Sequence, residues 1–259
     1  MKVSKDQHFL VDAEAVALIA SAIPVSNRKV LEIGPGKGAL TDALLRNGAI
    51  VRAIELDRTL LLNLERRFSD HIASGQLEII HGDASKVLLP EFELVVANLP
   101  YSISSKITFR LLETCFESAV LMYQFEFGKR MIAPPGNGEY GRLSVMTQTY
   151  ADVEMVLELP PEAFFPPPEV RSIVVKITPR GPPVLIQNRS VHDTLVRKLF
   201  SHRRKTIKNG LRSMQNIYGE SVMTNLVEDL PAKILEIRPE MLSVPDFIDL
   251  ANRLSTLIS

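Results

Sequence analysis

The first two-thirds of the chain alternates short apolar runs with segments of helical periodicity, and this alternation restricts the possible folds more than any other feature. The apolar runs are rich in β-branched residues and occupy residues 29–34, 49–56, 76–82, 92–99 and 118–125. Helix-like stretches such as "GALTDALLRNG" and "RTLLLNLERRFSDHI" lie between them. Strands that alternate with helices form a mostly parallel sheet covered on both faces, a doubly wound α/β fold. Two later runs, 152–159 and 172–179, are expected to close this sheet with an antiparallel strand.

Proline interrupts the chain twice, in "PPEAFFPPPEV" (160–170) and in "PRGPP" (179–183). Beyond the second interruption the strand pattern ends and only helical periodicity remains. Such a change of pattern at a proline-rich stretch is typical of a domain boundary. We therefore predict an α/β domain over residues 1–182 and an all-helical domain over residues 183–259, which suits a chain of 259 residues.

The composition excludes several classes of protein. No apolar run approaches the roughly 20 residues that a membrane-spanning helix needs. The N-terminal sequence "MKVSKDQHFLVDAE" has neither an apolar core nor a cleavage site, and Cys115 is the only cysteine, so we expect a cytoplasmic protein. Cys115 lies in the helix-like run "ITFRLLETCF" and is expected to be a small buried side chain.

Three glycines, Gly34, Gly36 and Gly38, follow the first apolar run directly and precede a helix. Glycine suits this place because the chain must turn tightly and let a ligand approach its backbone. The spacing is not the Gly-x-Gly-x-x-Gly pattern that seats a pyrophosphate on a helix N-terminus. Glu32 lies two residues upstream, where it would repel a diphosphate and favour a cationic ligand. S-adenosylmethionine (SAM), which carries a sulfonium and an ammonium, suits this turn better than a dinucleotide.

Two further acids follow the next strands. Glu55 ends the second strand and could accept hydrogen bonds from both ribose hydroxyls, and Asp83 follows the third and could accept one from the adenine amine. Each alone could equally cap the next helix. Because the carboxyl ends of parallel strands form the ligand-binding edge of such a sheet, the acids together favour a cofactor site.

The fourth strand leads into Asn98-Leu99-Pro100-Tyr101, an unusual ending for a buried strand. The Asn98 side-chain oxygen and the Leu99 carbonyl could accept the two hydrogens of an exocyclic amine and turn its lone pair towards a methyl donor. Pro100 would stiffen this corner, and Tyr101 offers a face on which a base can stack. The alternative is a plain Asn-x-Pro turn with a surface tyrosine.

With these residues in place, the chain resembles the KsgA family of rRNA adenine dimethyltransferases. The matching stretches are "QHFL" (7–10), "LEIGPGKGALT" (31–41), "IELD" (54–57), "GDA" (82–84), "NLPYSISS" (98–105), "YGRLSV" (140–145), "FFPPPEVRS" (164–172) and "FSHRRKTIKNGL" (200–211). They follow the family's order and cover nearly the whole chain. One departure is Gln124-Phe125-Glu126, where the commonest family sequence is "QKE".

The resemblance implies a Rossmann-like, SAM-dependent methyltransferase sheet and a set of site residues. His8, Leu10, Gly34, Glu55, Asp83 and Asn98 would contact SAM. Phe165 would close over the target adenine opposite Tyr101, and an aromatic ring held between prolines suits this role, while Phe164 is expected in the core. The five histidines are dispersed, with no cysteine or carboxylate at ligand spacing, so we predict no metal.

The chain has 30 basic and 30 acidic residues, but residues 194–219 contain no acid. The cations of this segment are Arg197, Lys198, Arg203, Arg204, Lys205, Lys208 and Arg212. At helical period, Leu199, Phe200, Ile207 and Leu211 form an inner stripe and the cations face outwards. The alternative is a charged face that is simply solvated. The absence of acids from the segment favours an RNA-binding surface.

These features and the resemblance together predict an enzyme that dimethylates the N6 amines of two adjacent adenosines in the 3′-terminal hairpin of small-subunit rRNA. Its partner would be a pre-ribosomal small subunit late in biogenesis, and we expect a monomer. Two alternatives remain: a large-subunit rRNA methyltransferase of the macrolide-resistance type, and a non-catalytic RNA-binding assembly or transcription factor. The first of these groups usually carries isoleucine where this chain has Leu99.

Overall fold

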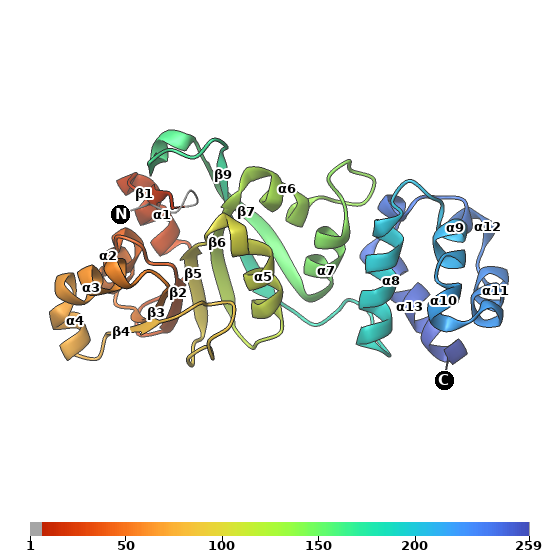
Figure 1. The fold of residues 1–259 in the computed structure, drawn as a ribbon, viewed down its shortest axis with the longest axis horizontal. Helices are drawn as coiled ribbons and strands as arrows, with labels where there is room; N and C mark the ends of the chain where they lie inside the picture. The colour runs from red at the N-terminus through yellow and green to blue at the C-terminus, as the bar shows by residue number, and fades with distance from the viewer. Residues whose placement is uncertain (1–6, 259) are drawn as a thin grey trace. The chain divides into compact units, whose positions relative to one another are not determined.

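A computed structural model describes residues 7–258, and the chain divides into two compact units (Figure 1). The first, here the α/β unit, runs to Gly128 and takes up the chain again over Asp152–Pro179. The second, here the helical unit, comprises Lys129–Ala151 and the chain from Arg180 onwards. The sequence interpretation assigned residues 129–151 to the first domain. The difference arises because the helix at Arg142–Tyr150 packs on helices of the C-terminal part of the chain.

Seven strands of the α/β unit form one sheet in the order β4-β3-β2-β5-β6-β9-β7. Their bounds are β2 (Lys29–Ile33), β3 (Ile50–Glu55), β4 (Leu77–His81), β5 (Leu94–Asn98), β6 (Ser118–Gln124), β7 (Ala151–Leu159) and β9 (Ser172–Pro179). The strands β4, β3, β2, β5 and β6 are parallel, and β9 runs antiparallel to β6. The predicted α/β fold, with an antiparallel strand near its end, is therefore confirmed.

The order of the strands reverses between β2 and β5. From β2 the chain proceeds through β3 to β4 on one side and then returns to place β5 on the other. In doubly wound sheets a crevice forms at such a switch point, outside the carboxyl ends of the strands. Ile33, Glu55 and Asn98 end the three strands that border this point.

Helices cover both faces of the sheet. They are α1 (Ala13–Ser21), α2 (Ala39–Arg46), α3 (Arg58–Arg67), α4 (Ser69–Ala73), α5 (Ser104–Leu112) and the start of α6 (Phe125–Ile132), with 3₁₀ turns at Tyr101–Ile103 and Pro161–Ala163. Right-handed crossovers put α2 and α3 on one face and α5 on the other. Leu44 of α2 and Leu64 of α3 pack with Val51 and Val96 of the sheet in a buried core.

A short antiparallel ribbon lies apart from the main sheet, formed by β1 (Phe9–Leu10) and β8 (Phe164–Phe165). Phe9 pairs with Phe165, and Leu10 pairs with Phe164. Figure 1 shows β1 beside the chain that joins β7 to β9. The ribbon therefore brings residues 7–10 to a segment more than 150 positions later, and the predicted burial of Phe164 is confirmed.

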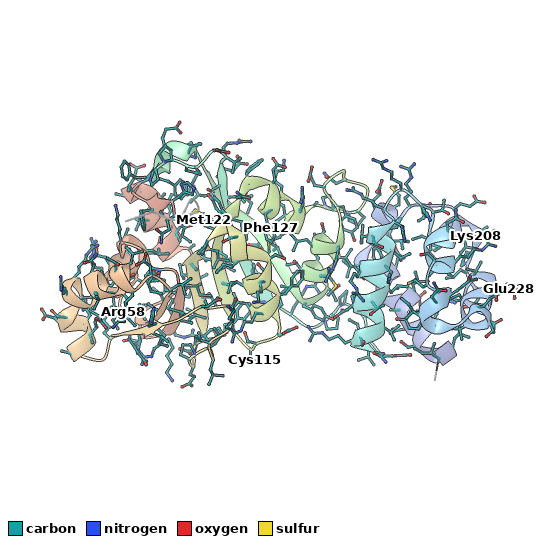
Figure 2. All side chains as sticks on the ribbon, in the orientation of Figure 1. Arg58, Cys115, Met122, Phe127, Lys208 and Glu228 are labelled. Carbon is teal, nitrogen blue, oxygen red and sulfur yellow. The ribbon has the colours of Figure 1, made fainter. Side chains whose placement is uncertain are left out.

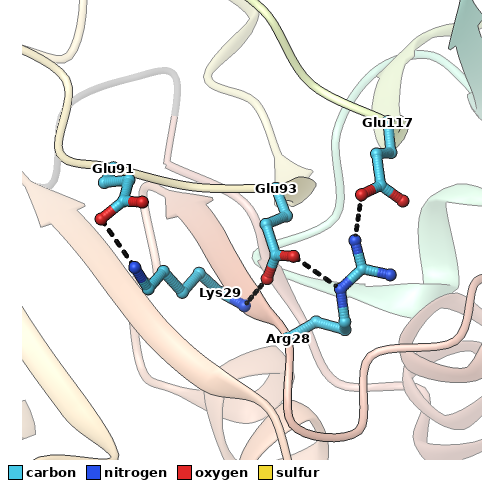
Figure 3. Close-up of polar contacts among 5 residues, drawn as sticks. All are labelled: Arg28, Lys29, Glu91, Glu93 and Glu117. Atoms are coloured by element: carbon cyan, nitrogen blue, oxygen red, sulfur yellow. Dashed lines mark hydrogen bonds and ion pairs between the residues drawn. The ribbon is translucent and has the colours of Figure 1, made fainter.

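An ion-pair network fixes the opposite, amino-terminal ends of the central strands (Figure 3). Arg28, Glu93 and Glu117 each immediately precede a strand, and Arg28 pairs with both glutamates, at 2.9 Å from Nε to Glu93 Oε1. The other Glu93 oxygen accepts the backbone N–H of Lys29 at 2.8 Å. These contacts join the beginnings of β2, β5 and β6 and leave their carboxyl ends free for a site.

The described part of the helical unit contains helices and turns. The helices are α7 (Arg142–Tyr150), α8 (Arg189–Ser201), α9 (Ile207–Arg212), α10 (Gln215–Tyr218), α11 (Glu220–Asp229), α12 (Ala232–Leu235) and α13 (Val244–Ile258), with a 3₁₀ turn at Pro239–Met241. Its core forms where α8 and α13 pack, with Phe200 and Phe247 ring centroids 5.5 Å apart.

The basic segment of this unit is not one continuous helix. The chain leaves α8 after Ser201 and enters α9 at Ile207. The two helices then approach closely at Gly210, where an added Cβ would lie 2.6 Å from Leu199 Cδ2. Leu199, Ile207 and Leu211 are buried as predicted, but they belong to two packed helices.

Cys115 corrects a sequence-based expectation. Helix α5 ends at Leu112, so Cys115 lies beyond it and is exposed (Figure 2). The buried side chain at this point is its neighbour Phe116. Within residues 7–258, no helix is long and apolar enough to cross a membrane.

Candidate cofactor and substrate site

A cavity opens at the switch point of the sheet, where β2, β3 and β5 end. Predicted residues from the glycine turn and β3 line it: Gly34, Gly36 and Glu55. The N-terminal segment contributes His8 and Leu10, and the corner after β5 contributes Asn98, Leu99, Pro100 and Tyr101. Segments that lie more than 90 residues apart in the chain thus meet around one space.

The glycine turn follows β2 and leads into α2. Gly36 has a left-handed φ of +59°, and a Cβ there would lie 3.0 Å from the Phe9 ring, so the turn needs glycine both for its backbone and for this contact. At Gly38, with φ of +81°, a Cβ would come within 2.7 Å of Phe68. The third glycine therefore lets the turn before α2 pack against the end of α3, and the first two form the cavity wall.

Glu55 ends β3 with its side chain almost fully buried. Its Oε2 accepts the backbone N–H of Gly36 at 3.1 Å, and its Oε1 accepts that of Asp57 at 2.8 Å. Burial raises the pKa of Glu55, and these backbone donors oppose the shift. Because each carboxylate oxygen can accept more than one hydrogen bond, Glu55 can still receive two hydroxyl donors from a ligand.

Glu32 is the second acid of the cavity, and its side chain is 1% exposed. Its Oε2 has no hydrogen-bond partner within residues 7–258. Burial, with a further contribution from the Glu55 charge, raises the pKa of Glu32 to about 8. An unpartnered buried carboxyl oxygen costs free energy unless a ligand supplies a donor or a cation. The residues present therefore fit SAM, whose ammonium and sulfonium are both positive.

Asn98 ends β5 at the edge of the cavity. Its side-chain Nδ2 donates to the backbone carbonyl of His8 at 3.3 Å, which assigns the amide orientation and leaves Oδ1 as an acceptor. The corner that follows is held by the Pro100 carbonyl, which accepts from Ile103 N and from Ser104 Oγ, each at 3.1 Å. The side chain of Leu99 is buried, so its backbone rather than its side chain is available to a ligand.

Tyr101 begins the 3₁₀ turn after this corner and is held at both ends. Its hydroxyl hydrogen-bonds to Ser172 Oγ at 2.8 Å, and its ring lies 5.9 Å from the His8 ring, tilted by 31°. Burial raises the pKa of Tyr101, so its phenol is neutral. The ring is thus fixed with part of its surface still accessible.

Two predicted site residues do not line this cavity. Asp83, after β4, accepts from Ser85 N at 2.9 Å and lies 3.1 Å from Lys86 Nζ. These partners lower the pKa of Asp83 to about 2. Phe165 is exposed and lines an adjoining hollow together with Lys37 and Arg67. Both residues remain close to the site, since Gly82 donates to Glu55 O and Phe165 pairs with Phe9.

The predicted RNA-binding cations lie on α8, on α9 and in the turn between them. Arg197, Arg204, Lys205 and Arg212 are exposed, while Lys198 and Lys208 are partly buried. Arg203 differs, because its Nε pairs with Glu240 at 2.8 Å. Residues 194–219 contain no acid, but the fold brings Glu240 next to this segment. No local sequence pattern indicates this contact. Among the described residues, the other six cations make no ion pair.

Sequence reasoning missed Ser172, the partner of Tyr101. Ser172 begins β9 and is fully buried, and its position in "FFPPPEVRS" was the only available signal. Lys37, between two of the glycines, was also missed, although it lines the cavity.

In the part of the chain that the structure describes, no group of three histidine, cysteine or acidic side chains could hold a metal ion.

The fold and the cavity define a Rossmann-like enzyme of the SAM-dependent methyltransferase class, with an acid-lined cofactor cavity beside a rigid asparagine corner. The profile described as ribosomal RNA adenine dimethylase matches residues 1–239, and the chain belongs to this family. This confirms the family that the sequence motifs indicated.

Individual relatives agree with this assignment. A protein of Methanospirillum hungatei JF-1 named "Probable ribosomal RNA small subunit methyltransferase A" is 52% identical and covers 99% of this chain and 100% of its own. The crystal structure of a dimethyladenosine transferase from Plasmodium falciparum is 30% identical, with a TM-score of 0.83 over 96% of this chain and 98% of that one. The structure of the 23S rRNA methyltransferase ErmE is 28% identical, with a TM-score of 0.66 over 95% and 99%.

Proposed function

We propose that the protein transfers methyl groups from SAM to the N6 amines of two adjacent adenosines in the 3′-terminal hairpin of small-subunit rRNA, which yields N6,N6-dimethyladenosine. The 52% identical relative is named for the small ribosomal subunit, and the 30% identical structure is named a dimethyladenosine transferase. The large-subunit enzyme ErmE shares the fold at 28% identity.

The observation that carries the proposal is the orientation of Asn98. Because Nδ2 donates to the His8 carbonyl, Oδ1 is left to accept a hydrogen from an incoming amine. The Leu99 carbonyl can accept the second hydrogen. An adenine amine is a poor nucleophile because its lone pair is delocalised into the ring. Two fixed acceptors favour a pyramidal nitrogen, with the lone pair directed into the cavity.

SAM, when bound, supplies a methyl group on a positively charged sulfur. Glu55 makes the cavity negative, and Glu32 adds to this charge once a bound cation ionises it. His8 and Leu10 line the cavity, and the backbone of Gly34 and Gly36 allows close approach. Asp83 lies two residues beyond the end of the neighbouring strand β4, outside the cavity lining, and would accept from the adenine amine of SAM. The substrate amine gives up one proton for each methyl group it gains. This proton can leave to water, so the corner needs only to position the amine.

Tyr101 supplies the surface on which the target base stacks. A base inside a helix cannot reach such a cavity, so the adenosine must be flipped out or single-stranded. The hydrogen bond to Ser172 and the neighbouring His8 ring hold the tyrosine ring in place, which lowers the entropic cost of stacking. The same pocket must accept a monomethylated adenine for the second transfer.

The helical unit would bind the rRNA backbone. The cations of α8, α9 and their connecting turn provide positive charge without base-specific geometry, which suits the recognition of a folded RNA by shape and phosphates. The enzyme would act as a cytoplasmic monomer on a pre-ribosomal small subunit late in its biogenesis. A binding role in assembly can coexist with catalysis.

The experiment that tests this function uses small subunits from cells that lack the modification. The purified protein is incubated with labelled SAM and with either small or large subunits, and the modified nucleotides are then mapped. We expect label only in small subunits, as dimethyladenosine at two adjacent positions. Label in large subunits would identify the macrolide-resistance type of activity, and binding without label would identify a non-catalytic factor.

A further inference from the structure

A second hollow, of about 400 Å³, adjoins the cofactor cavity. Phe165 and Pro166 line it on one side, and Arg67 of α3 lines it on the other. Phe9, Gly36 and Lys37 line both spaces, so the two hollows lie side by side. Its volume falls in the range of about 300–1,000 Å³ that is usual for small-ligand sites.

The hollow presents an exposed aromatic ring. Phe165 is 62% exposed, and the other phenylalanines and tyrosines within residues 7–258 are buried or partly buried. Its neighbour Phe164 is buried, and β1 pairs with both residues, so the backbone holds the Phe165 ring at the rim. An aromatic face that the fold keeps in solvent is typical of sites where bases stack.

Cations accompany the ring. Lys37 Nζ lies 4.7 Å from the Phe9 centroid and 5.6 Å from the Phe165 centroid, and it has no ion pair with a described residue. Arg67 donates to the Lys37 carbonyl at 2.8 Å, which holds it beside the glycine turn. Its guanidinium lies 4.0 Å from Asp42, which also pairs with Arg46, so its charge is only weakly compensated.

One acid belongs to the same hollow. The Oδ1 atom of Asp57 caps α3 by accepting from Thr59 N at 2.8 Å and Leu60 N at 3.3 Å. The hollow therefore contains two cations and one carboxylate, and this carboxylate already accepts backbone N–H groups of α3. A ligand with a flat apolar ring and a negative group complements this arrangement, provided that the negative group lies towards Lys37 and away from Asp57.

We propose that this hollow holds the nucleotide next to the target adenosine, with its base stacked on Phe165 and its phosphate facing Lys37 and Arg67. The inference rests on the proposed function. It assigns Phe165 to a flanking base rather than to the target base, because Phe165 does not line the cavity of Asn98 and Tyr101. Holding the neighbour fixes the strand and so positions the flipped adenosine, which would favour a substrate with two adjacent target adenosines.

The test measures the affinity of RNA hairpins that carry one target adenosine. One hairpin is intact, and two others have an abasic nucleotide on the 5′ or the 3′ side of the target. Dissociation constants are determined by fluorescence anisotropy for the wild type, Phe165→Ala, Tyr101→Ala, Lys37→Ala and Arg66→Ala. Arg66 is an exposed neighbour of Arg67 on α3 that does not line the hollow, so it serves as the matched control.

We expect one of the two abasic changes to weaken wild-type binding by about 5- to 150-fold, the range of base–aromatic stacking. Phe165→Ala should weaken binding of the intact hairpin by a similar factor and should not weaken binding of that abasic hairpin further. Tyr101→Ala should weaken binding of the intact hairpin and of the abasic hairpin. Lys37→Ala should weaken all hairpins alike and reduce the salt dependence by about one phosphate contact. Arg66→Ala should change neither quantity.

The proposal is overturned if neither abasic change weakens wild-type binding, or if Phe165→Ala costs the same on intact and on both abasic hairpins. The second result would place the ring on the target base or on no base at all. Label transfer to small subunits by the wild type, measured in parallel, separates the two proposals. If the losses from Phe165→Ala and from one abasic change are not additive but no label is transferred, the proposed function is refuted and the subsite stands. If label is transferred but the two losses are additive, the subsite is refuted and the proposed function stands.

Discussion

Asn98 donates its side-chain Nδ2 to the backbone carbonyl of His8, 90 residues earlier in the chain, at 3.3 Å. The bond links the end of β5 to the N-terminal segment that covers the cofactor cavity. It also determines which amide atom is left for a substrate. The orientation of the Asn98 amide is thus set by a backbone atom that belongs to another part of the fold.

The first prediction concerns Asn98→Ala. The variant loses the acceptor for the substrate amine but leaves Glu32, Glu55 and the glycine turn intact, so SAM affinity should stay within a few fold. Turnover should fall by about 10²-fold or more, the usual cost of removing one fixed polar group that stabilises a transition state. Calorimetric titration with SAM and single-turnover methylation measure the two quantities. An equal loss in both would contradict the role given to Asn98.

The second prediction concerns the bond between Tyr101 and Ser172. Tyr101→Phe and Ser172→Ala each remove the same hydrogen bond, so each should lower kcat/KM by roughly fivefold, which corresponds to about 1 kcal/mol. The double variant should lose no more than either single variant, because the interaction is shared. Kinetics on unmodified small subunits provide the measurement. Additive losses would show that the two side chains act separately.

Much of the site was predictable because the carboxyl ends of parallel strands meet at one edge. The glycine turn follows an apolar run, and Glu55 and Asn98 lie at the ends of two others, so the alternation of strands and helices already places them together. The orientation of Asn98 and the anchoring of Tyr101 were not predictable. Both depend on partners that are distant in sequence, His8 and Ser172, and neither leaves a local pattern.

Three other features were hard to predict because each depends on where a helix ends or on which element packs against it. Arg203 meets Glu240 only because the helical unit folds back on itself, and Cys115 is exposed only because α5 stops three residues before it. Residues 129–151 precede the proline-rich stretch at which the sequence predicts the domain boundary, yet they belong to the helical unit, where α7 packs against α8. Helical periodicity identifies a buried face but does not identify the element that covers it.

The third prediction concerns Glu32 and the pH dependence of SAM binding. Glu32 has a pKa of about 8 in the free protein, so at pH 7 it is mostly protonated. A bound cation favours the ionised form and lowers this pKa, so SAM binding at pH 7 should release close to one proton. Affinity should rise with pH up to about 8 and then level off, and Glu32→Gln should remove this dependence.

Calorimetric titration in buffers of different ionisation enthalpy measures the number of released protons. Glu14→Gln is the control, because Glu14 is an exposed acid of α1 outside the cavity. It should leave both the proton release and its pH dependence as in the wild type. A proton count that persists in Glu32→Gln would assign the titration to another group.

The fourth prediction separates backbone strain from packing at Gly38. Gly38→Ala places a Cβ 2.7 Å from Phe68 and 2.8 Å from Leu64 at a φ of +81°. Backbone strain and overpacking therefore both destabilise this variant. Gly75→Ala has a similar φ of +76° with nothing within 4 Å of the new Cβ, so it carries only the backbone term. Overpacking costs about 1–3 kcal/mol, and urea unfolding should show Gly38→Ala less stable than Gly75→Ala by an amount in this range. Equal losses would show that α2 and α3 can separate freely here.

The fifth prediction concerns Glu93, which joins Arg28 to the start of β2. The Lys29 backbone N–H and then the Arg28 guanidinium lower the pKa of Glu93 below its ordinary value of 4.5. A carboxyl whose folded pKa is lowered stabilises the fold above its unfolded pKa, and this stabilisation is lost as pH falls through the folded value. Glu93→Gln should therefore lower the Tm at pH 7, and the difference from wild type should shrink below about pH 4.5. Glu91→Gln is the matched control, because the Glu91 side chain is 82% exposed and, among the described residues, pairs only with the Lys29 side chain. The Tm of this variant should stay near that of the wild type. A Glu93→Gln difference that is the same at pH 7 and pH 4 would show that its charge does not fix the strand ends.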